Sequence, residues 1–292
     1  MPGRGIDFEQ RFKPSRWAED LLIESLGARY GLLAKRFGLS EVRPSDKLVY
    51  GLTSYKEPDL LVFRAADLSD DEKKKLESTN LDSTDREAFY GQADLSFAFP
   101  KAAAGVEVEF SPYRASEMTG RHWNLRSDDQ WQKRPLKRAI PPIAPNIFVK
   151  EEDLPKLLEW ERTTTVPIVI VHLFDQEAFA VSLKMISEFN ARFENGTENR
   201  IQLQVTTGIF KLLQSYDRTD AQGAGEKKMV FRVAPAAAIK VGDVTGVTVS
   251  AQLGLSTSKK YVTQPVFSGG KIEITNEFLA LLNSLPRRLP YA

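Results

Sequence analysis

The order of apolar and polar residues predicts alternating helices and strands in the first half of the chain. Between Trp17 and Phe37, apolar residues recur at helical spacing, and Gly38 follows as a stop signal. The apolar run at residues 60–63 follows a proline and predicts a short strand. Further elements are expected in this half: a strand at 48–52, a charged helix at 68–82, a helix that begins at Thr84 and a strand at 106–110.

The second half begins with a nearly continuous apolar run, VPIVIVHLF at residues 166–174, which predicts a strand buried on both faces. His172 lies inside this run and is expected to be a core residue whose hydrogen bonds are satisfied. Asp175 is expected to cap a helix that ends at Asn195-Gly196. Strands are then expected at 201–205, 228–233, 246–255, 260–267 and 269–275, before a closing helix at 276–285.

This succession of elements predicts an α/β (α+β) fold with a mixed central β-sheet flanked by helices. No composition shift or linker divides the chain, so we expect one domain over residues 1–292. Within it, a catalytic α/β core is expected at about residues 17–195 and a β-rich C-terminal extension at about 196–292.

Composition narrows the possible chemistry. The chain has 292 residues, of which 42% are hydrophobic and 27% charged, values typical of a globular protein. It contains no cysteine and only two histidines, which excludes disulfides, thiolate catalysis and zinc sites built on these side chains. A divalent metal would have to be held by oxygen ligands, which favours magnesium, calcium or manganese.

No apolar run approaches the roughly 20 residues of a membrane span, and the first residues lack the apolar core of a signal peptide. We therefore expect a cytoplasmic protein that does not associate with membranes. The formal net charge is only +1, so any nucleic-acid contact must come from local clustering of basic residues.

The sequence GVEVEF, which begins at Gly105, combines alternating apolar residues with two acidic ones. Because side chains alternate between the faces of a strand, Val106, Val108 and Phe110 should share one face, and Glu107 and Glu109 the other. Two neighbouring carboxylates repel each other unless water or a cation relieves them. Taken alone, the pattern also fits a half-exposed antiparallel strand.

A third carboxylate stands upstream, in the sequence Glu57-Pro58-Asp59 at the entrance of the strand at 60–63. If the two strands are neighbours in one sheet, Asp59 would join Glu107 and Glu109, and three converging carboxylates suit a hard divalent cation. Asp94 is an alternative, because only twelve residues separate it from Glu107, against 47 for Asp59. The preceding proline and the unbroken apolar strand favour Asp59.

These residues give the chain a resemblance to the PD-(D/E)XK nucleases, especially type II restriction endonucleases. Pro58-Asp59 matches the first half of the motif, and Glu107-Val108-Glu109 matches the second half as a BamHI-like E-x-E variant, with glutamate in place of lysine. The resemblance implies a restriction-endonuclease-like core, in which the motif aspartate lies on one strand and the E-x-K pair on the next.

It also implies Mg²⁺-dependent, sequence-specific cleavage of double-stranded DNA that leaves 5′-phosphate ends, carried out by a homodimer. Asp59 and Glu107 would hold magnesium, while Glu109 would orient or deprotonate the attacking water. Lys56 or Lys101 would supply the positive charge that the E-x-E variant lacks. Two alternatives remain open: a structure-specific repair or recombination nuclease of the same fold, and a DNA-binding protein without catalysis.

The segment that follows the E-x-E strand is basic. Residues 111–140 contain seven basic and three acidic residues, and Trp123 and Trp131 lie between these charged positions. Arginines can bind guanine edges and lysines can bind phosphates, although a solvated loop would have the same composition. The candidate DNA-binding residues are Arg114, Arg121, Arg126, Lys133, Arg134 and Lys137.

Overall fold

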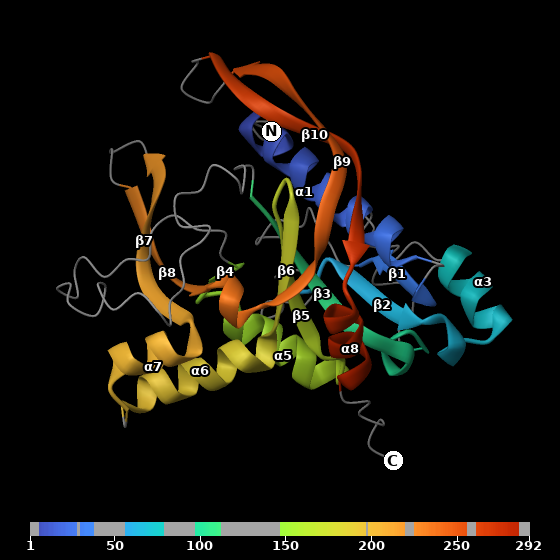
Figure 1. The fold of residues 1–292 in the computed structure, drawn as a ribbon, viewed down its shortest axis with the longest axis horizontal. Helices are drawn as coiled ribbons and strands as arrows, with labels where there is room; N and C mark the ends of the chain where they lie inside the picture. Colours follow the sequence, from blue (N-terminus) through green and yellow to red (C-terminus); the bar gives the residue numbers. More distant parts are fainter. Residues whose placement is uncertain are drawn as a thin grey trace, which may run out of the picture.

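The computed structural model describes residues 6–27, 30–37, 56–78, 97–111, 147–196, 198–219, 225–255 and 261–285. The expected strand at 48–52 and the expected helix from Thr84 lie outside these ranges. The expected α/β (α+β) class, a mixed sheet flanked by helices, is confirmed (Figure 1).

A seven-stranded sheet forms the centre of the molecule, with the strand order β1-β2-β3-β5-β6-β9-β10. The pair β3–β5 is parallel, and every other neighbouring pair in this sheet is antiparallel. The strands are β1 (Leu32–Arg36), β2 (Leu60–Arg64), β3 (Ala102–Phe110), β5 (Ile168–Leu173), β6 (Glu177–Ser182), β9 (Ile239–Leu255) and β10 (Tyr261–Ile274).

A second sheet of three strands has the order β4-β8-β7. Its strands are β4 (Ile147–Lys150), β8 (Gly225–Val233) and β7 (Ile209–Thr219). The helices are α1 (Ile6–Leu26), α3 (Asp70–Ser78), α5 (Leu154–Thr164), α6 (Leu183–Asn195), α7 (Arg200–Thr207) and α8 (Asn276–Ser284), with short 3-10 turns at Ala65–Asp67, Phe99–Lys101 and Pro235–Ala237.

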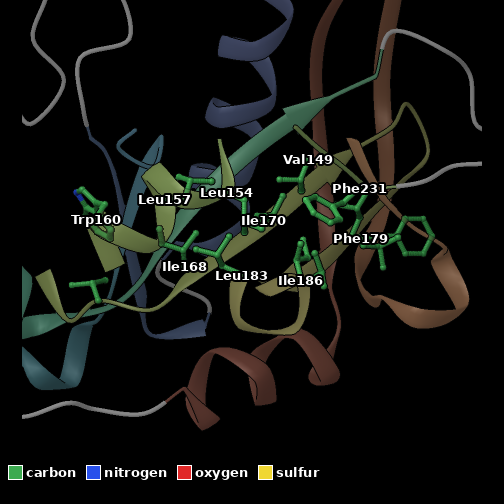
Figure 2. Packing of buried hydrophobic residues seen from close by; sticks show 14 of the residues in the cluster. Val149, Leu154, Leu157, Trp160, Ile168, Ile170, Phe179, Leu183, Ile186 and Phe231 are labelled. Atoms are coloured by element: carbon green, nitrogen blue, oxygen red, sulfur yellow. The ribbon is translucent and has the colours of Figure 1, made fainter. Parts of the chain in front are cut away.

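The large sheet carries a separate hydrophobic layer on each face. On one face, Leu22 of α1 and Phe278 of α8 pack with Val106 and Val169 of the sheet. On the other, helices α5 and α6 and the small sheet cover Ile168 and Ile170, as Figure 2 shows. Because β3 and β5 lie between these layers, a polar side chain on either strand is removed from bulk water.

The predicted helix at residues 17–37 is wrong in its second half. Helix α1 ends at Leu26, and residues 32–36 form β1, whose partner is β2. Gly31 lies in the left-handed region with a φ of 65°, which lets the chain turn between the two elements. Leu33 matches the helical spacing by coincidence, because pairing with Phe63 decides its conformation.

The prediction that Asp175 caps a helix is also wrong. Asp175 lies between β5 and β6, where the Phe174 amide donates to the Glu177 carbonyl at 2.9 Å and closes a hairpin. The cap is Ser182, whose hydroxyl accepts from the Met185 amide at the start of α6. The same helix ends at Gly196, as predicted.

Residues 201–205, predicted as a strand, belong to helix α7 instead. The Asn199 side chain accepts hydrogen bonds from the amides of Ile201 and Gln202 and so begins the helix. The predicted strands at 60–63, 106–110 and 166–174 are confirmed as β2, β3 and β5, and the charged helix at 68–82 is confirmed in the shorter range of α3. In the part of the chain described above, no helix is both long and apolar enough to cross a membrane.

Candidate carboxylate site

Strand β3 divides its side chains between two different environments. Val106 and Val108 are 0% and 6% exposed and belong to the layer beneath α1. Glu107 points to the opposite face and is only 4% exposed. The predicted division of this strand into an apolar and an acidic face is therefore confirmed. Glu107 is buried and Glu109 half-buried, so free exposure to water does not offset the charge of Glu107.

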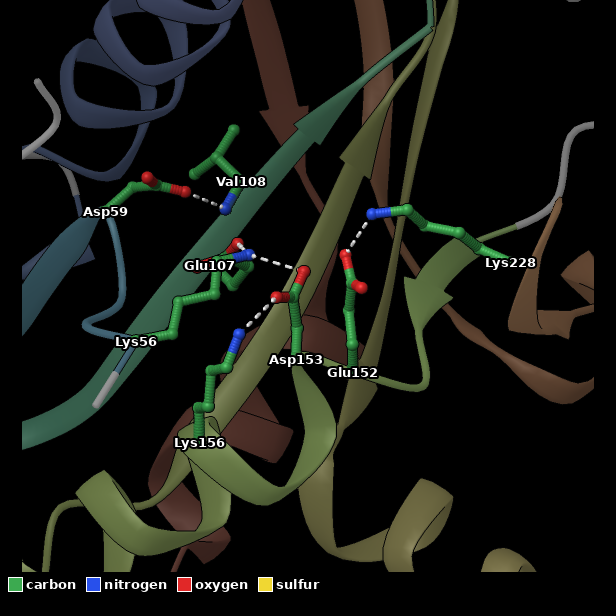
Figure 3. A network of polar contacts seen from close by, with 8 residues as sticks. All are labelled: Lys56, Asp59, Glu107, Val108, Glu152, Asp153, Lys156 and Lys228. Atoms are coloured by element: carbon green, nitrogen blue, oxygen red, sulfur yellow. Dashed lines mark hydrogen bonds and ion pairs between the residues drawn. The ribbon is translucent and has the colours of Figure 1, made fainter. Parts of the chain in front are cut away.

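Asp59 stands beside this acidic strand. Strands β2 and β3 are antiparallel with Leu60 opposite Val106, so the residue before β2 falls next to Glu107. The Asp59 carboxylate accepts a hydrogen bond from the Val108 amide at 2.7 Å (Figure 3). Its backbone carbonyl accepts from the Phe37 amide at 2.8 Å, which fixes the residue from the other side. Asp59 thus lies beside Glu107, at the backbone of the strand that carries both glutamates.

Lys56 supplies a positive charge to this group of carboxylates. Its ammonium forms an ion pair with Glu107 and lies 3.4 Å from the Asp153 carboxylate, as Figure 3 shows. Lys101, the other lysine considered from the sequence, lies elsewhere: its ammonium is 3.2 Å from Glu72. Of these two lysines, only Lys56 reaches the acidic face of β3.

Asp153 is the site residue that sequence reasoning missed. It occupies the N-cap position of α5 but makes no side-chain capping hydrogen bond. Its carboxylate faces the Lys56 ammonium and also lies 3.9 Å from Lys156. The sequence signal, an aspartate before Leu154-Pro155, indicates only a helix start, because capping is what an aspartate usually does there.

The electrostatics of the site reflect an excess of buried negative charge. Burial, with repulsion from Glu107 and Glu19, holds the pKa of Asp59 well above its usual range. Burial and the charge of Glu107 raise the pKa of Glu109 to about 7, partly opposed by Lys56 and by Lys150 of β4. Both carboxyls would ionise more readily if further positive charge were present.

Lys56 shows the opposite effect of the same charges. Burial by itself lowers the pKa of an ammonium group, yet the carboxylates of Glu107, Asp153 and Glu109 together raise the pKa of Lys56 above its ordinary value. Lys56 is therefore positively charged at neutral pH and does not act as a general acid or base there.

Glu107 keeps one oxygen without a partner. Its Oε1 binds Lys56, while the buried Oε2 has no hydrogen-bond partner among the described residues. A buried, unpaired carboxylate oxygen is costly, and a bound cation would relieve it. Within the ranges described, no three Asp, Glu, His or Cys side chains are already arranged as a metal cage. The donors nevertheless fit a hard divalent ion, because Asp59 and Glu107 offer oxygen ligands only.

His172 lies next to the site on strand β5. The parallel register of β3 and β5 pairs it with Glu109, so both side chains point to the same face of the sheet. The ring stacks on Phe174 at 4.6 Å, and burial lowers its pKa to about 3. Neither ring nitrogen has a partner in the part of the chain that the structure describes. The expectation of a satisfied core histidine is thus right about the core and wrong about the hydrogen bonds.

The remaining candidate residues lie outside the described ranges. They are Asp94, the alternative to Asp59, and the basic residues Arg114, Arg121, Arg126, Lys133, Arg134 and Lys137.

Comparison of the chain with protein-family models, with curated proteins and with solved structures finds no match in any of the three.

Proposed function

We propose that the protein is a Mg²⁺-dependent endonuclease of the type II restriction class that hydrolyses phosphodiester bonds of double-stranded DNA. The observation that carries this proposal is the position of Asp59 against the Glu107-x-Glu109 strand, with a hydrogen bond of 2.7 Å to the intervening Val108. Forty-seven residues of sequence separate Asp59 from Glu107, so local structure does not bring them together.

The order of elements around the site supports the same proposal. The motif aspartate precedes β2, the two glutamates lie on its sheet neighbour β3, and α5 and the parallel strand β5 follow. This agrees with the helix, mixed sheet and helix expected of a restriction-endonuclease-like core.

Each side chain of the site has a defined task in the proposed reaction. Magnesium held by Asp59 and Glu107 would lower the pKa of bound water and neutralise charge on the phosphate. Glu109, with a pKa of about 7, can accept a proton from the attacking water near neutral pH. Lys56 can donate a hydrogen bond to a phosphate oxygen and so bring the positive charge that position 109 lacks.

The proposed hydrolysis consumes one water molecule and needs no other co-reactant. The water oxygen forms a bond to phosphorus, and the bond from phosphorus to the 3′ oxygen breaks. The water proton passes to Glu109, and the departing 3′ oxygen takes a proton from solvent. The products are a 5′-phosphate and a 3′-hydroxyl end.

The basic segment at 111–140 would bind DNA, with Arg114 nearest to the catalytic strand in sequence. A palindromic recognition site would favour a homodimer, because the two-fold symmetry of protein and DNA then coincide.

The proposal is tested by incubating the protein with plasmid DNA in Mg²⁺ or in EDTA. Discrete fragments are expected in Mg²⁺ only, and Glu107→Gln should slow cleavage about a thousandfold, since a carboxylate that supports the metal contributes several kcal/mol to the transition state. Glu188→Gln, which changes an exposed carboxylate of α6, is the matched control and should cleave normally.

Other outcomes decide between the alternatives. Nicking at random positions would favour a repair nuclease over a restriction enzyme. DNA binding without cleavage in Mg²⁺, Mn²⁺ or Ca²⁺ would overturn the catalytic proposal. Asp59→Asn and Asp94→Asn should be compared directly, because the variant that keeps full cleavage has lost a residue that the reaction does not use.

A further inference from the structure

The carboxylate of Asp153 is directed away from the helix that it begins. An aspartate at the N-cap position normally accepts a hydrogen bond from an amide of the first turn, and this one accepts none. Its side chain is 14% exposed and faces the Lys56 ammonium at 3.4 Å. Its backbone has helical angles, with a φ of −88° and a ψ of −26°, instead of the extended angles of a capping residue, and its carboxylate is directed to Lys56.

The other partner of Lys56 is Glu107, the carboxylate that the proposed metal site requires. Its Oε1 binds the lysine and its Oε2 is buried without a partner among the described residues. An ammonium ion on Oε1 and a divalent cation on Oε2 repel each other across one carboxylate, so a lysine held by Glu107 alone would oppose metal binding. A second anion beside the lysine removes this conflict.

We infer that Asp153 is a positioning residue that shares the Lys56 ammonium with Glu107 and retains it when a divalent cation binds to Glu107. Without metal, Lys56 offsets the charge of both carboxylates. With metal, the ammonium remains on Asp153 and stays within the site, where it can meet a phosphate oxygen. This inference rests on the proposed metal-dependent function. It explains how the metal and Lys56 can both bind within one cluster of carboxylates.

The inference predicts that removing Lys56 and removing Asp153 change the metal affinity in opposite directions. Removing the lysine in Lys56→Met deletes a cation that competes with the metal, and Mn²⁺ should bind about tenfold more tightly. Removing the second anion in Asp153→Asn leaves Lys56 entirely on Glu107, and Mn²⁺ should bind about tenfold more weakly. Asp153→Glu retains the charge and should restore most of the lost affinity.

The experiment is a calorimetric titration of the whole chain with Mn²⁺ alone, without DNA, at one pH and salt concentration. The matched control is Glu152→Gln, which removes the neighbouring carboxylate, whose ammonium partner is Lys228 at 2.7 Å (Figure 3). This control should bind Mn²⁺ as the wild type does. Melting curves in EDTA establish that each variant is folded, and Lys56→Gln replaces Lys56→Met if that variant does not fold. If neither lysine variant folds, Asp153→Asn and Asp153→Glu decide alone.

The possible results separate the inference from the function on which it rests. If the wild type binds Mn²⁺ and cleaves DNA while Asp153→Asn binds the metal normally, the positioning role is wrong and the nuclease proposal stands. If Lys56→Met weakens Mn²⁺ binding, competition is wrong, because the lysine then supports the metal. If the wild type binds no Mn²⁺ and does not cleave, both fail together. Loss of affinity in Asp153→Asn with recovery in Asp153→Glu supports the inference even where no DNA substrate has yet been found.

Discussion

Two lysines of this protein are each held by two carboxylates, but their surroundings differ. Lys211 of β7 has a side chain that is only 5% exposed, and its ammonium lies 2.6 Å from Glu151 and 2.5 Å from Glu194. Those carboxylates are 40% and 54% exposed and remain in contact with water. The side chain of Lys56 is more accessible, at 30%, while the side chains of Glu107 and Asp153 are 6% and 14% exposed.

The difference lies in which partner is buried. The buried ammonium of Lys211 pairs with two carboxylates and donates a hydrogen bond to Asn190 Oδ1 at 3.1 Å. Its charge is therefore balanced without a further ion. At Lys56 the anions are buried, and Asp59 and Glu109 stand beside them with raised pKa values. In the described part of the chain, Glu107 is the only carboxylate with a buried unpaired oxygen. The Lys211 cluster therefore has no unpaired buried charge, whereas the site at β3 has an unpaired carboxylate oxygen that could bind another cation.

The largest expected effect on the free energy of unfolding comes from removing Lys56, with removal of Lys211 as the comparison. Lys56→Met leaves Glu107 buried and unpaired, and should lower the free energy of unfolding in EDTA by about 3 kcal/mol. Mg²⁺ should restore much of this loss, because it can take the place of the ammonium. Lys211→Met should cost about 2 kcal/mol, since its carboxylates can rehydrate, and Mg²⁺ should not restore it. Urea denaturation of both variants, with and without Mg²⁺, measures the contrast, and an equal response to Mg²⁺ would contradict it.

A smaller effect concerns the pH dependence of stability. The pKa of Glu109 is about 7 in the folded protein against an ordinary value of 4.5, so between these values the folded chain binds a proton that the unfolded chain has released. The contribution of Glu109 to stability in EDTA should therefore fall as the pH rises from about 4.5 to about 7, which the difference between the wild type and a Glu109 variant isolates. Glu109→Gln removes this dependence and should be about 2 kcal/mol more stable than the wild type at pH 8.

Melting temperatures recorded across this pH range test the expectation for Glu109. At pH 4.5 the variant and the wild type should differ little. Glu188→Gln, in the exposed part of α6, is the control and should follow the wild type at every pH. A wild type that gains stability from pH 5 to pH 8 relative to Glu109→Gln would mean that another cation already neutralises this carboxylate.

The smallest effect concerns His172, the neutral polar neighbour of Glu109. Its pKa is about 3 in the fold against 6.5 ordinarily, so the unfolded chain takes up a proton that the folded chain does not. The contribution of His172 to stability should fall as the pH drops from 6.5 towards 3. His172→Phe removes this cost and two unpaired nitrogens, and should be about 1 kcal/mol more stable than the wild type at pH 5. Chemical denaturation at pH 5 and pH 8 tests this, and a less stable variant at both would show that the ring has a polar partner.

Local pattern was sufficient for the two central strands β3 and β5, whose apolar residues pack against the layers on one or both faces of the sheet. Strand β5 was predicted from its continuous apolar run, and all six of its residues are buried. The alternation in β3 predicted both faces of the strand, because alternation depends only on backbone geometry. The failures had different causes: Leu33 pairs with the distant Phe63, whereas a short hairpin that pairs His172 with Phe179 replaced the expected helix cap. Residues 201–205 became helical because the nearby Asn199 caps α7.

The sequence by itself determined that Glu107 and Glu109 share one face of a strand, and that a metal site can have no cysteine ligand and at most two histidines. The tertiary structure alone decided what stands opposite that face. Lys56 and Asp59 come from the segment before β2 and Asp153 from the start of α5. They reach β3 only because β2 and α5 pack beside it. Asp153 could not have been foreseen, since an aspartate before a helix has a local role that explains it fully. Side-chain periodicity is a property of neighbouring residues, whereas a cluster of charges from distant segments depends on how the whole chain closes.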